Sequence, residues 1–138
     1  MEIVIKWKGV RANSDPKWKY SRVLYAYIAP HTNEILYIGK AGKLSVRRRW
    51  CRSGKVKFWD ALEKERRIFK HATIVGDIYM DEGSRFSQQI LSDIESLLIK
   101  RIKPWGNDKS RYTRISRPGM RVKCEGAWPI EKKEFWDR

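Results

Sequence analysis

The carboxylate of Glu95 is the first side chain whose position points to chemistry. It lies four residues after Leu91 and seven before Ile102, in an apolar pattern of helical spacing, so it falls at the margin of the buried stripe. A carboxylate there is half shielded from water and can still face a cleft, which suits a hard divalent cation that keeps several waters. The alternative is a solvated charge that pairs with a neighbouring cation such as Lys100.

Two phenols, Tyr25 and Tyr37, lie on segments that are expected to form neighbouring strands. Antiparallel pairing could bring both side chains to the same face of the sheet. A phenol near a divalent cation and a guanidinium is pushed toward phenolate and can then take a proton from water. Tyrosines in strands are also common packing residues, and this structural interpretation stays open.

Glycine and lysine residues follow Tyr37. Gly39 permits a backbone conformation or a close approach that a side chain would forbid. Lys40 and Lys43 flank a short turn and could contact phosphates, although the GxxxxGK[ST] spacing of a P-loop is absent.

Three arginines, Arg47, Arg48 and Arg49, follow Ser45, which can cap a short helix. These arginines could form a solvated basic face. The same geometry could also turn one guanidinium into a cleft and two toward a DNA backbone.

Hydrophobic periodicity predicts the elements that position these residues. A strand pair at 23–29 and 35–39 has a turn between its members and is expected to form an antiparallel hairpin. The longest helix is expected to begin at Ser84 or Ser87 and to end before Pro104. The other predicted segments are strands at 3–7, 72–79 and 120–125, helices at 45–52 and 58–67, a loop at 8–21 and a helical turn at 131–136.

Charge narrows the choice of partner. The 138 residues contain 31 Lys and Arg against 16 Asp and Glu, a net charge of +15, and the pI is near 10.1. A small domain so far from neutrality repels itself, and this usually persists because the partner is a polyanion. The composition therefore predicts a nucleic-acid partner. It does not favour a membrane surface, because the basic residues are dispersed and no long amphipathic basic helix stands out.

The remaining composition predicts a single intracellular domain. No apolar run approaches the roughly 20 residues that cross a bilayer, and the N-terminus lacks the features of a signal peptide. The two cysteines, Cys51 and Cys124, are far apart and match no metal-ligand spacing, so free thiols are expected.

In their order and spacing, these segments resemble the signature of the GIY-YIG nuclease family. Residues 23–25 (VLY) resemble the first triplet, with Val in place of the usual Gly, and residues 37–39 (YIG) match the second. Arg47 lies eight positions after Gly39, at the arginine position of the family. Cys51 stands where many members carry a histidine.

The resemblance extends to the end of the long helix. Glu95 and the following LLIKRIKPWGN resemble the family's Glu-helix-Pro-Asn ending, which makes Asn107 the last element. The match covers roughly residues 22–108 as a catalytic core within one domain, 1–138. The flanks 1–21 and 109–138 are rich in Lys, Arg and Trp and could hold DNA or be ordinary solvated surface.

The resemblance implies an α+β fold, with a central three-stranded antiparallel sheet flanked by helices and a possible extra N-terminal strand. It implies a metal-dependent DNA endonuclease that leaves 5′-phosphate and 3′-hydroxyl ends. Glu95 would ligate Mg²⁺ or Mn²⁺, Tyr25 would act as general base with Tyr37 or Lys40 positioning the water, and Arg47 would neutralise the phosphorane. Asn107 would hold the geometry of the site. The expected DNA-binding residues are Lys43, Arg48, Arg49, Arg52, Arg111 and Arg114.

The biological role stays open on the sequence. A restriction-type enzyme, which would form a homodimer to cut both strands, and a structure-specific or repair-type nicking enzyme both fit. A non-catalytic nucleic-acid-binding module is the alternative, although all five polar positions of the signature carry the expected residue types. An enzyme acting on RNA is a weaker alternative, because no RNA-binding motif is present.

Overall fold

The structure, a computed structural model, describes residues 1–11, 14–19, 22–42, 45–47, 53–81, 85–107 and 119–137. The five strands that the sequence predicted are present, with ends that differ by up to three residues. The predicted helix at 58–67 begins five residues earlier. In chain order the elements are β1 (Glu2–Val10), η1 (Pro16–Lys19), β2 (Val23–Ile28), β3 (Ile35–Ala41), α2 (Ser53–Arg66), β4 (Ala72–Met80), α3 (Gln88–Ile102), β5 (Arg121–Gly126) and β6 (Glu134–Trp136).

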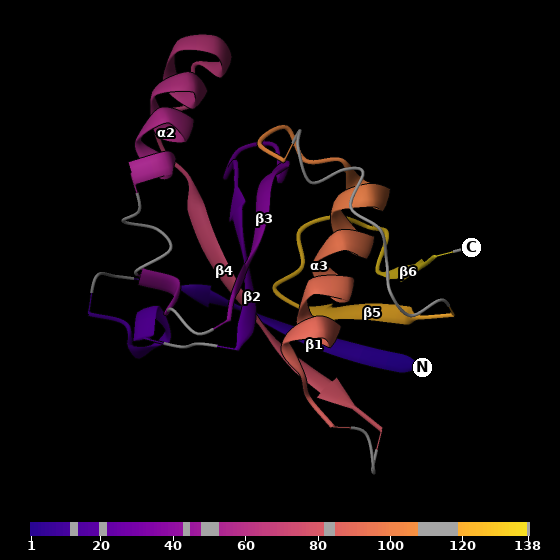
Figure 1. Cartoon of the computed structure of the whole chain (residues 1–138). Helices are drawn as coiled ribbons and strands as arrows, with labels where there is room; N and C mark the ends of the chain where they lie inside the picture. Colours follow the sequence, from indigo (N-terminus) through magenta and orange to yellow (C-terminus); the bar gives the residue numbers. More distant parts are fainter. Residues whose placement is uncertain are drawn as a thin grey trace.

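The expected three-stranded antiparallel sheet flanked by helices is wrong. The six strands form one mixed sheet in the order β3-β2-β4-β1-β5-β6. The predicted trio β3, β2 and β4 is antiparallel, but β4 also pairs with β1, and β1 pairs in parallel with β5. Both edge strands, β3 and β6, contact α3, so the sheet curls around that helix (Figure 1).

The N-terminal strand is interior because its apolar side chains have partners on both sides. Ile3, Ile5 and Trp7 are buried and alternate with exposed or half-buried residues, and β5 places Val122 beside Ile3 and Cys124 beside Ile5. Burial raises the pKa of the Cys124 thiol to about 12, and the thiol is free, as predicted.

The C-terminal segment also belongs to the sheet. The helical turn predicted at 131–136 is wrong, because residues 134–136 form β6 and pair antiparallel with β5. Phe135 is buried opposite Val122, whereas its two neighbours are exposed. A three-residue strand leaves too short an alternation for the sequence to separate it from a helical turn.

Helix α3 has the boundaries that its sequence predicts. The Ser87 hydroxyl accepts a hydrogen bond from the backbone N–H of Ile90 at 3.1 Å, which caps the first turn. Lys103 adopts a left-handed conformation, and its N–H donates to the Ile99 carbonyl at 2.8 Å, just before Pro104. The apolar stripe of α3 packs on the sheet face that carries Leu24, Ala26 and Ile38.

The opposite face of β2 and β3 carries the tyrosines. Val23, Tyr25 and Tyr27 belong to a second buried cluster that also contains Leu62 of α2. Two different layers therefore cover the two faces of the hairpin, α3 on one side and a layer that includes α2 on the other. No helix within the described ranges is long and apolar enough to cross a membrane.

Candidate active site

The two predicted tyrosines lie on the same face of the hairpin, as their strand positions predicted. Tyr25 is opposite Gly39 and Tyr27 is opposite Tyr37. The ring centroids of Tyr25 and Tyr37 are 6.0 Å apart in a stacked arrangement. Tyr27, which the sequence analysis did not select, contacts both rings, with centroids 5.4 Å from Tyr25 and 5.6 Å from Tyr37, so the three rings form a triangle. Its spacing of two residues from Tyr25 was the available signal.

The three rings differ in their access to solvent. Tyr25 is 2% exposed and Tyr27 is fully buried, whereas Tyr37 is half-buried. Phe58 of α2 shields two of the rings from solvent, because its ring centroid lies 5.5 Å from that of Tyr37 and 6.0 Å from that of Tyr27. Tyr37 is therefore the most accessible phenol of the cluster.

Gly39 is required by the position of the Tyr25 ring. A Cβ atom built on Gly39 would lie 2.5 Å from the Tyr25 hydroxyl oxygen and in collision with the ring itself. The hydroxyl end of the ring thus lies directly against the glycine of the Tyr37-Ile38-Gly39 triplet. The glycine permits close approach of a side chain here, rather than an unusual backbone angle.

Replacing Gly39 with alanine should displace the Tyr25 ring and loosen the cluster. We expect a loss of about 1–3 kcal/mol in the free energy of unfolding, the usual cost of overpacking a core. Thermal and urea unfolding would measure it. Gly9→Ala is the matched control, because a Cβ atom on Gly9, also in a strand, meets nothing within 4 Å. Equal stability of the two variants would contradict the close packing of Tyr25 on Gly39.

Asn107 is tied to the edge strand β3. Its side-chain Nδ2 donates to the Ile38 carbonyl at 2.8 Å, and its Oδ1 accepts from the Ile38 N–H, also at 2.8 Å. The neighbouring Gly106 N–H donates to the Leu36 carbonyl at 2.7 Å. Asn107 is 4% exposed. The segment after α3 thus takes the place of a further strand along β3, and it satisfies backbone groups that an edge would leave open.

Lys40 and Glu95 lie toward the other face of β3. The Lys40 ammonium donates to the Ser92 hydroxyl on α3, and Ser92 is three residues, about one helical turn, before Glu95. Glu95 is half-buried, as its helical position predicted. On the same helix, Asp93 is 1% exposed and accepts from Gln89 Nε2 at 2.9 Å.

Arg47 is exposed and follows Val46, which is fully buried in the cluster of Tyr25 and Tyr27. Val46 and Arg47 are helical, as expected for a helix that begins after Ser45. The predicted DNA-contacting residues lie outside the described residues: Lys43, Arg48, Arg49, Arg52, Arg111 and Arg114.

Known proteins offer no match. No protein-family model, curated protein or solved structure is significantly similar to this chain. The function must therefore be argued from the residues and their geometry.

The candidate site is arranged around the edge strand β3. Tyr25 and Tyr37 lie on one face, Lys40 and the α3 residue Glu95 lie toward the other, and Asn107 closes the edge between them. Within the described ranges, no group of three or more His, Cys, Asp or Glu residues could hold a metal ion. A cation at this site would have Glu95 as its carboxylate ligand and would keep several waters, a coordination that suits Mg²⁺.

Proposed function

We propose that this protein is a metal-dependent endonuclease that hydrolyses DNA to 5′-phosphate and 3′-hydroxyl ends. The observation that supports this most strongly is the Asn107 contact. Asn107 lies 69 residues after Ile38, yet both polar groups of its side chain bond the middle residue of the YIG triplet. The last element of the signature, Asn107, thus bonds through its side chain to the backbone of the YIG triplet. These are two segments that the nuclease signature would bring together.

In this proposal, Arg47 and Lys40 contribute the positive charge that a phosphorane needs. Charged donors fixed where charge develops are worth several kcal/mol in a transition state. Glu95 would hold Mg²⁺ or Mn²⁺, whose charge would stabilise the scissile phosphate and the departing 3′ oxygen. Asn107 fixes β3, which is the strand that carries Tyr37 and Lys40.

The phenol best suited to meet the attacking water is that of Tyr37. The resemblance assigned the general base to Tyr25, but Tyr25 is 2% exposed and Tyr37 is half-buried. We therefore assign proton transfer to Tyr37, with Tyr25 holding its ring by stacking at 6.0 Å.

The second candidate function is a non-catalytic nucleic-acid-binding module. It is favoured by the burial of Tyr25 and Tyr27, and by the position of Glu95 on the helix that packs against the opposite face of the sheet. Both candidates use the net charge of +15, which favours a polyanion. A homodimer is the arrangement we propose if the enzyme cuts both strands, because one site cuts one strand.

A supercoiled plasmid distinguishes these functions. The nuclease should convert it to nicked or linear forms with Mg²⁺ or Mn²⁺ and should leave it intact in EDTA. End-labelling with and without prior phosphatase treatment would identify the 5′-phosphate. Discrete fragments would indicate sequence specificity. Binding without cleavage on plasmid, duplex, flap and single-stranded DNA with either metal would instead support the module.

A further inference from the structure

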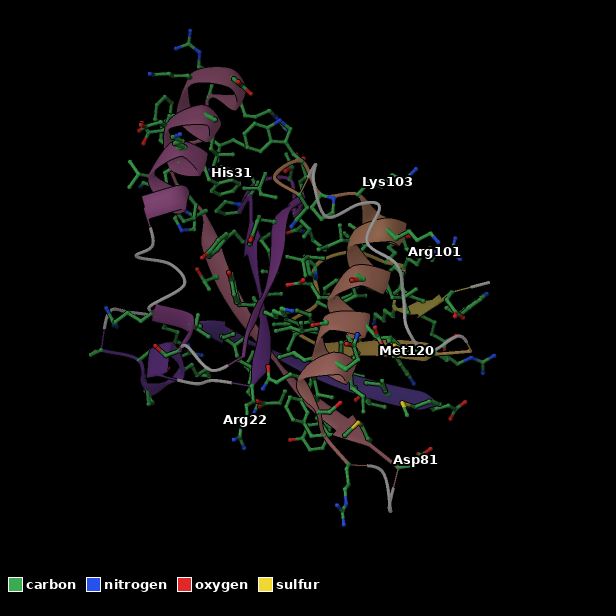
Figure 2. All side chains as sticks on the ribbon, in the orientation of Figure 1. Arg22, His31, Asp81, Arg101, Lys103 and Met120 are labelled. Carbon is green, nitrogen blue, oxygen red and sulfur yellow. The ribbon has the colours of Figure 1, made fainter. Side chains whose placement is uncertain are left out.

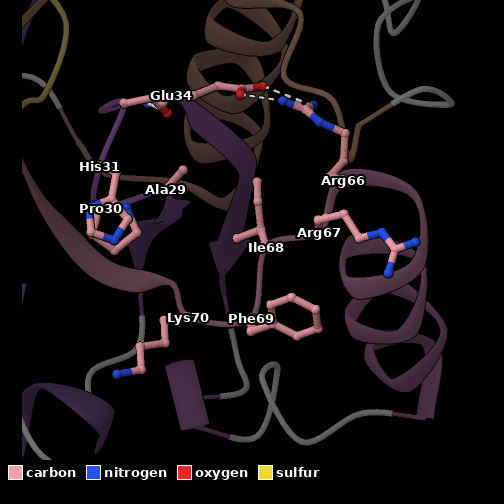
Figure 3. A pocket seen from close by; sticks show the side chains of 10 residues that line it. Ala29, Pro30, His31, Glu34, Arg66, Arg67, Ile68, Phe69 and Lys70 are labelled. Atoms are coloured by element: carbon pink, nitrogen blue, oxygen red, sulfur yellow. Dashed lines mark hydrogen bonds and ion pairs between the residues drawn. The ribbon is translucent and has the colours of Figure 1, made fainter.

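A pocket of about 520 Å³ opens at the turn end of the β2–β3 hairpin (Figure 3). Its walls are the turn residues 29–32 and 34 on one side and, on the other, the last residue of α2, Arg66, with the connecting residues 67–70. The volume falls in the range of about 300–1,000 Å³ that small-molecule sites occupy. Glu34 is three residues before Tyr37 and five before Gly39. At about 3.3 Å per residue, the pocket therefore lies roughly 10–16 Å along β3 from the tyrosine face of the candidate site.

Phe69 forms an exposed aromatic wall of this pocket. It is 67% exposed, the highest value among the large hydrophobic side chains that the structure describes. In the view of Figure 3, its ring lies between the side chains of Arg67 and Lys70. An exposed ring in a pocket that is also lined by Arg67 and Lys70 offers a stacking surface to a base and countercharges to the adjoining phosphates.

The acidic group of the pocket is already neutralised. Arg66 binds Glu34 through two contacts, Nη1 to Oε2 at 3.1 Å and Nη2 to Oε1 at 2.5 Å. This hydrogen bonding raises the pKa of Arg66, which holds the guanidinium in its charged form. Glu34 is the single carboxylate among the described lining residues, so the charges of Arg67 and Lys70 remain to attract an anion.

The basic surface continues beyond Glu34. A second pocket of about 370 Å³ shares Glu34 and is lined by Arg101, Lys103 and Lys132. Figure 2 shows His31, Lys103 and Arg101 toward the same end of the molecule. The two pockets therefore adjoin along one basic surface that includes aromatic side chains, the combination that single-stranded nucleic acid requires.

We propose that the Phe69 pocket binds an unpaired base of a nucleic-acid strand, with Phe69 stacking on the base and Arg67 and Lys70 contacting the flanking phosphates. This rests on the proposed function, because it takes the partner to be nucleic acid. The distance along β3 is short enough for one unpaired strand to reach both the pocket and the candidate site. The preferred substrate is then a DNA with an unpaired segment near the cut, such as a flap or a fork.

The test is the affinity for labelled oligothymidylate and for a duplex of the same length, measured in EDTA so that nothing is cleaved. Phe69→Ala should weaken single-strand binding roughly tenfold, the loss of one stacked base, and should leave duplex binding within twofold. Phe69→Tyr, which keeps the ring, should bind as the parent does. The control is Tyr79→Ala, because Tyr79 is 47% exposed at the other end of β4.

Salt dependence tests the two cations independently of the Phe69 ring. Replacing Arg67 and Lys70 together by alanine should reduce the salt slope of single-strand binding by about 1.4, since each phosphate contact contributes about 0.7. An unchanged slope would overturn their assignment as phosphate contacts.

The outcomes separate this inference from the nuclease proposal. Unchanged single-strand affinity of Phe69→Ala, or an equal loss for single strand and duplex, overturns the pocket assignment even if the parent cleaves plasmid. A parent that binds single strands through Phe69 and cleaves nothing supports the pocket and overturns the nuclease. A parent that binds no nucleic acid overturns both.

Discussion

Replacing Glu95 with glutamine should reduce metal-dependent DNA cleavage by at least a hundredfold while the protein stays folded. The substitution preserves the size of the side chain and removes the charge that would hold Mg²⁺. Loss of one fixed electrostatic contribution to a transition state commonly costs about 10²–10³ in rate. Initial rates of plasmid nicking, measured with increasing Mg²⁺ and Mn²⁺, would report this loss.

The matched control for Glu95 is Glu65→Gln, an exposed carboxylate on α2. It should cleave like the parent with the same metal dependence. DNA binding in EDTA should be equal for all three proteins, because the metal-free site contributes little to affinity. If Glu95→Gln nicks plasmid at the parent rate, Glu95 is not the metal ligand and the site must be sought elsewhere.

Replacing Asn107 with alanine should destabilise the protein by about 3 kcal/mol, which corresponds to a fall of roughly 10 °C in Tm. The substitution removes two hydrogen bonds of 2.8 Å and leaves the N–H and carbonyl of Ile38 buried without their partners. Thermal and urea unfolding would measure the loss. We also expect cleavage to fall, because β3 carries Tyr37 and Lys40.

A second variant tests whether both halves of the amide are used. Asn107→Asp should be as unstable as Asn107→Ala near pH 7, because a carboxylate accepts from the Ile38 N–H but repels the Ile38 carbonyl. Protonation restores a donor, so Asn107→Asp should gain stability relative to Asn107→Ala as the pH falls toward about 4. A constant difference between the two variants across this range would contradict the paired hydrogen bonds.

Local patterns predicted the parts of the fold that depend on neighbouring residues. The hairpin followed from two β-branched, aromatic segments separated by a turn, and α3 followed from its apolar spacing, the Ser87 cap and Pro104. The half-buried position of Glu95 followed from the same helical geometry. In each case the predictive residues are close in the sequence, within one or two helical turns or within two consecutive strands.

Long-range pairing explains what the sequence could not predict. The position of β1 inside the sheet depends on β4 and β5, whose partners for Ile5 are Ile78 and Cys124. Alternation identifies a strand but not its neighbours, so the expectation of three strands with a possible extra N-terminal strand did not place β1 between β4 and β5 and left β5 and β6 out of the sheet. Similarly, the burial of Tyr25 depends on a covering layer from other parts of the chain, which strand alternation does not encode.

The interior position of β1 has a consequence for how the protein is made. Ile5 leaves the ribosome 73 residues before its partner Ile78, an interval of about 4–15 s at 5–20 residues per second. Its partner Cys124 on the other side comes later still. During synthesis, a strand that carries Ile3, Ile5 and Trp7 therefore waits with both backbone edges unpaired. Slow, late-completing folding and a need for chaperone protection of the nascent β1 segment are the expected result.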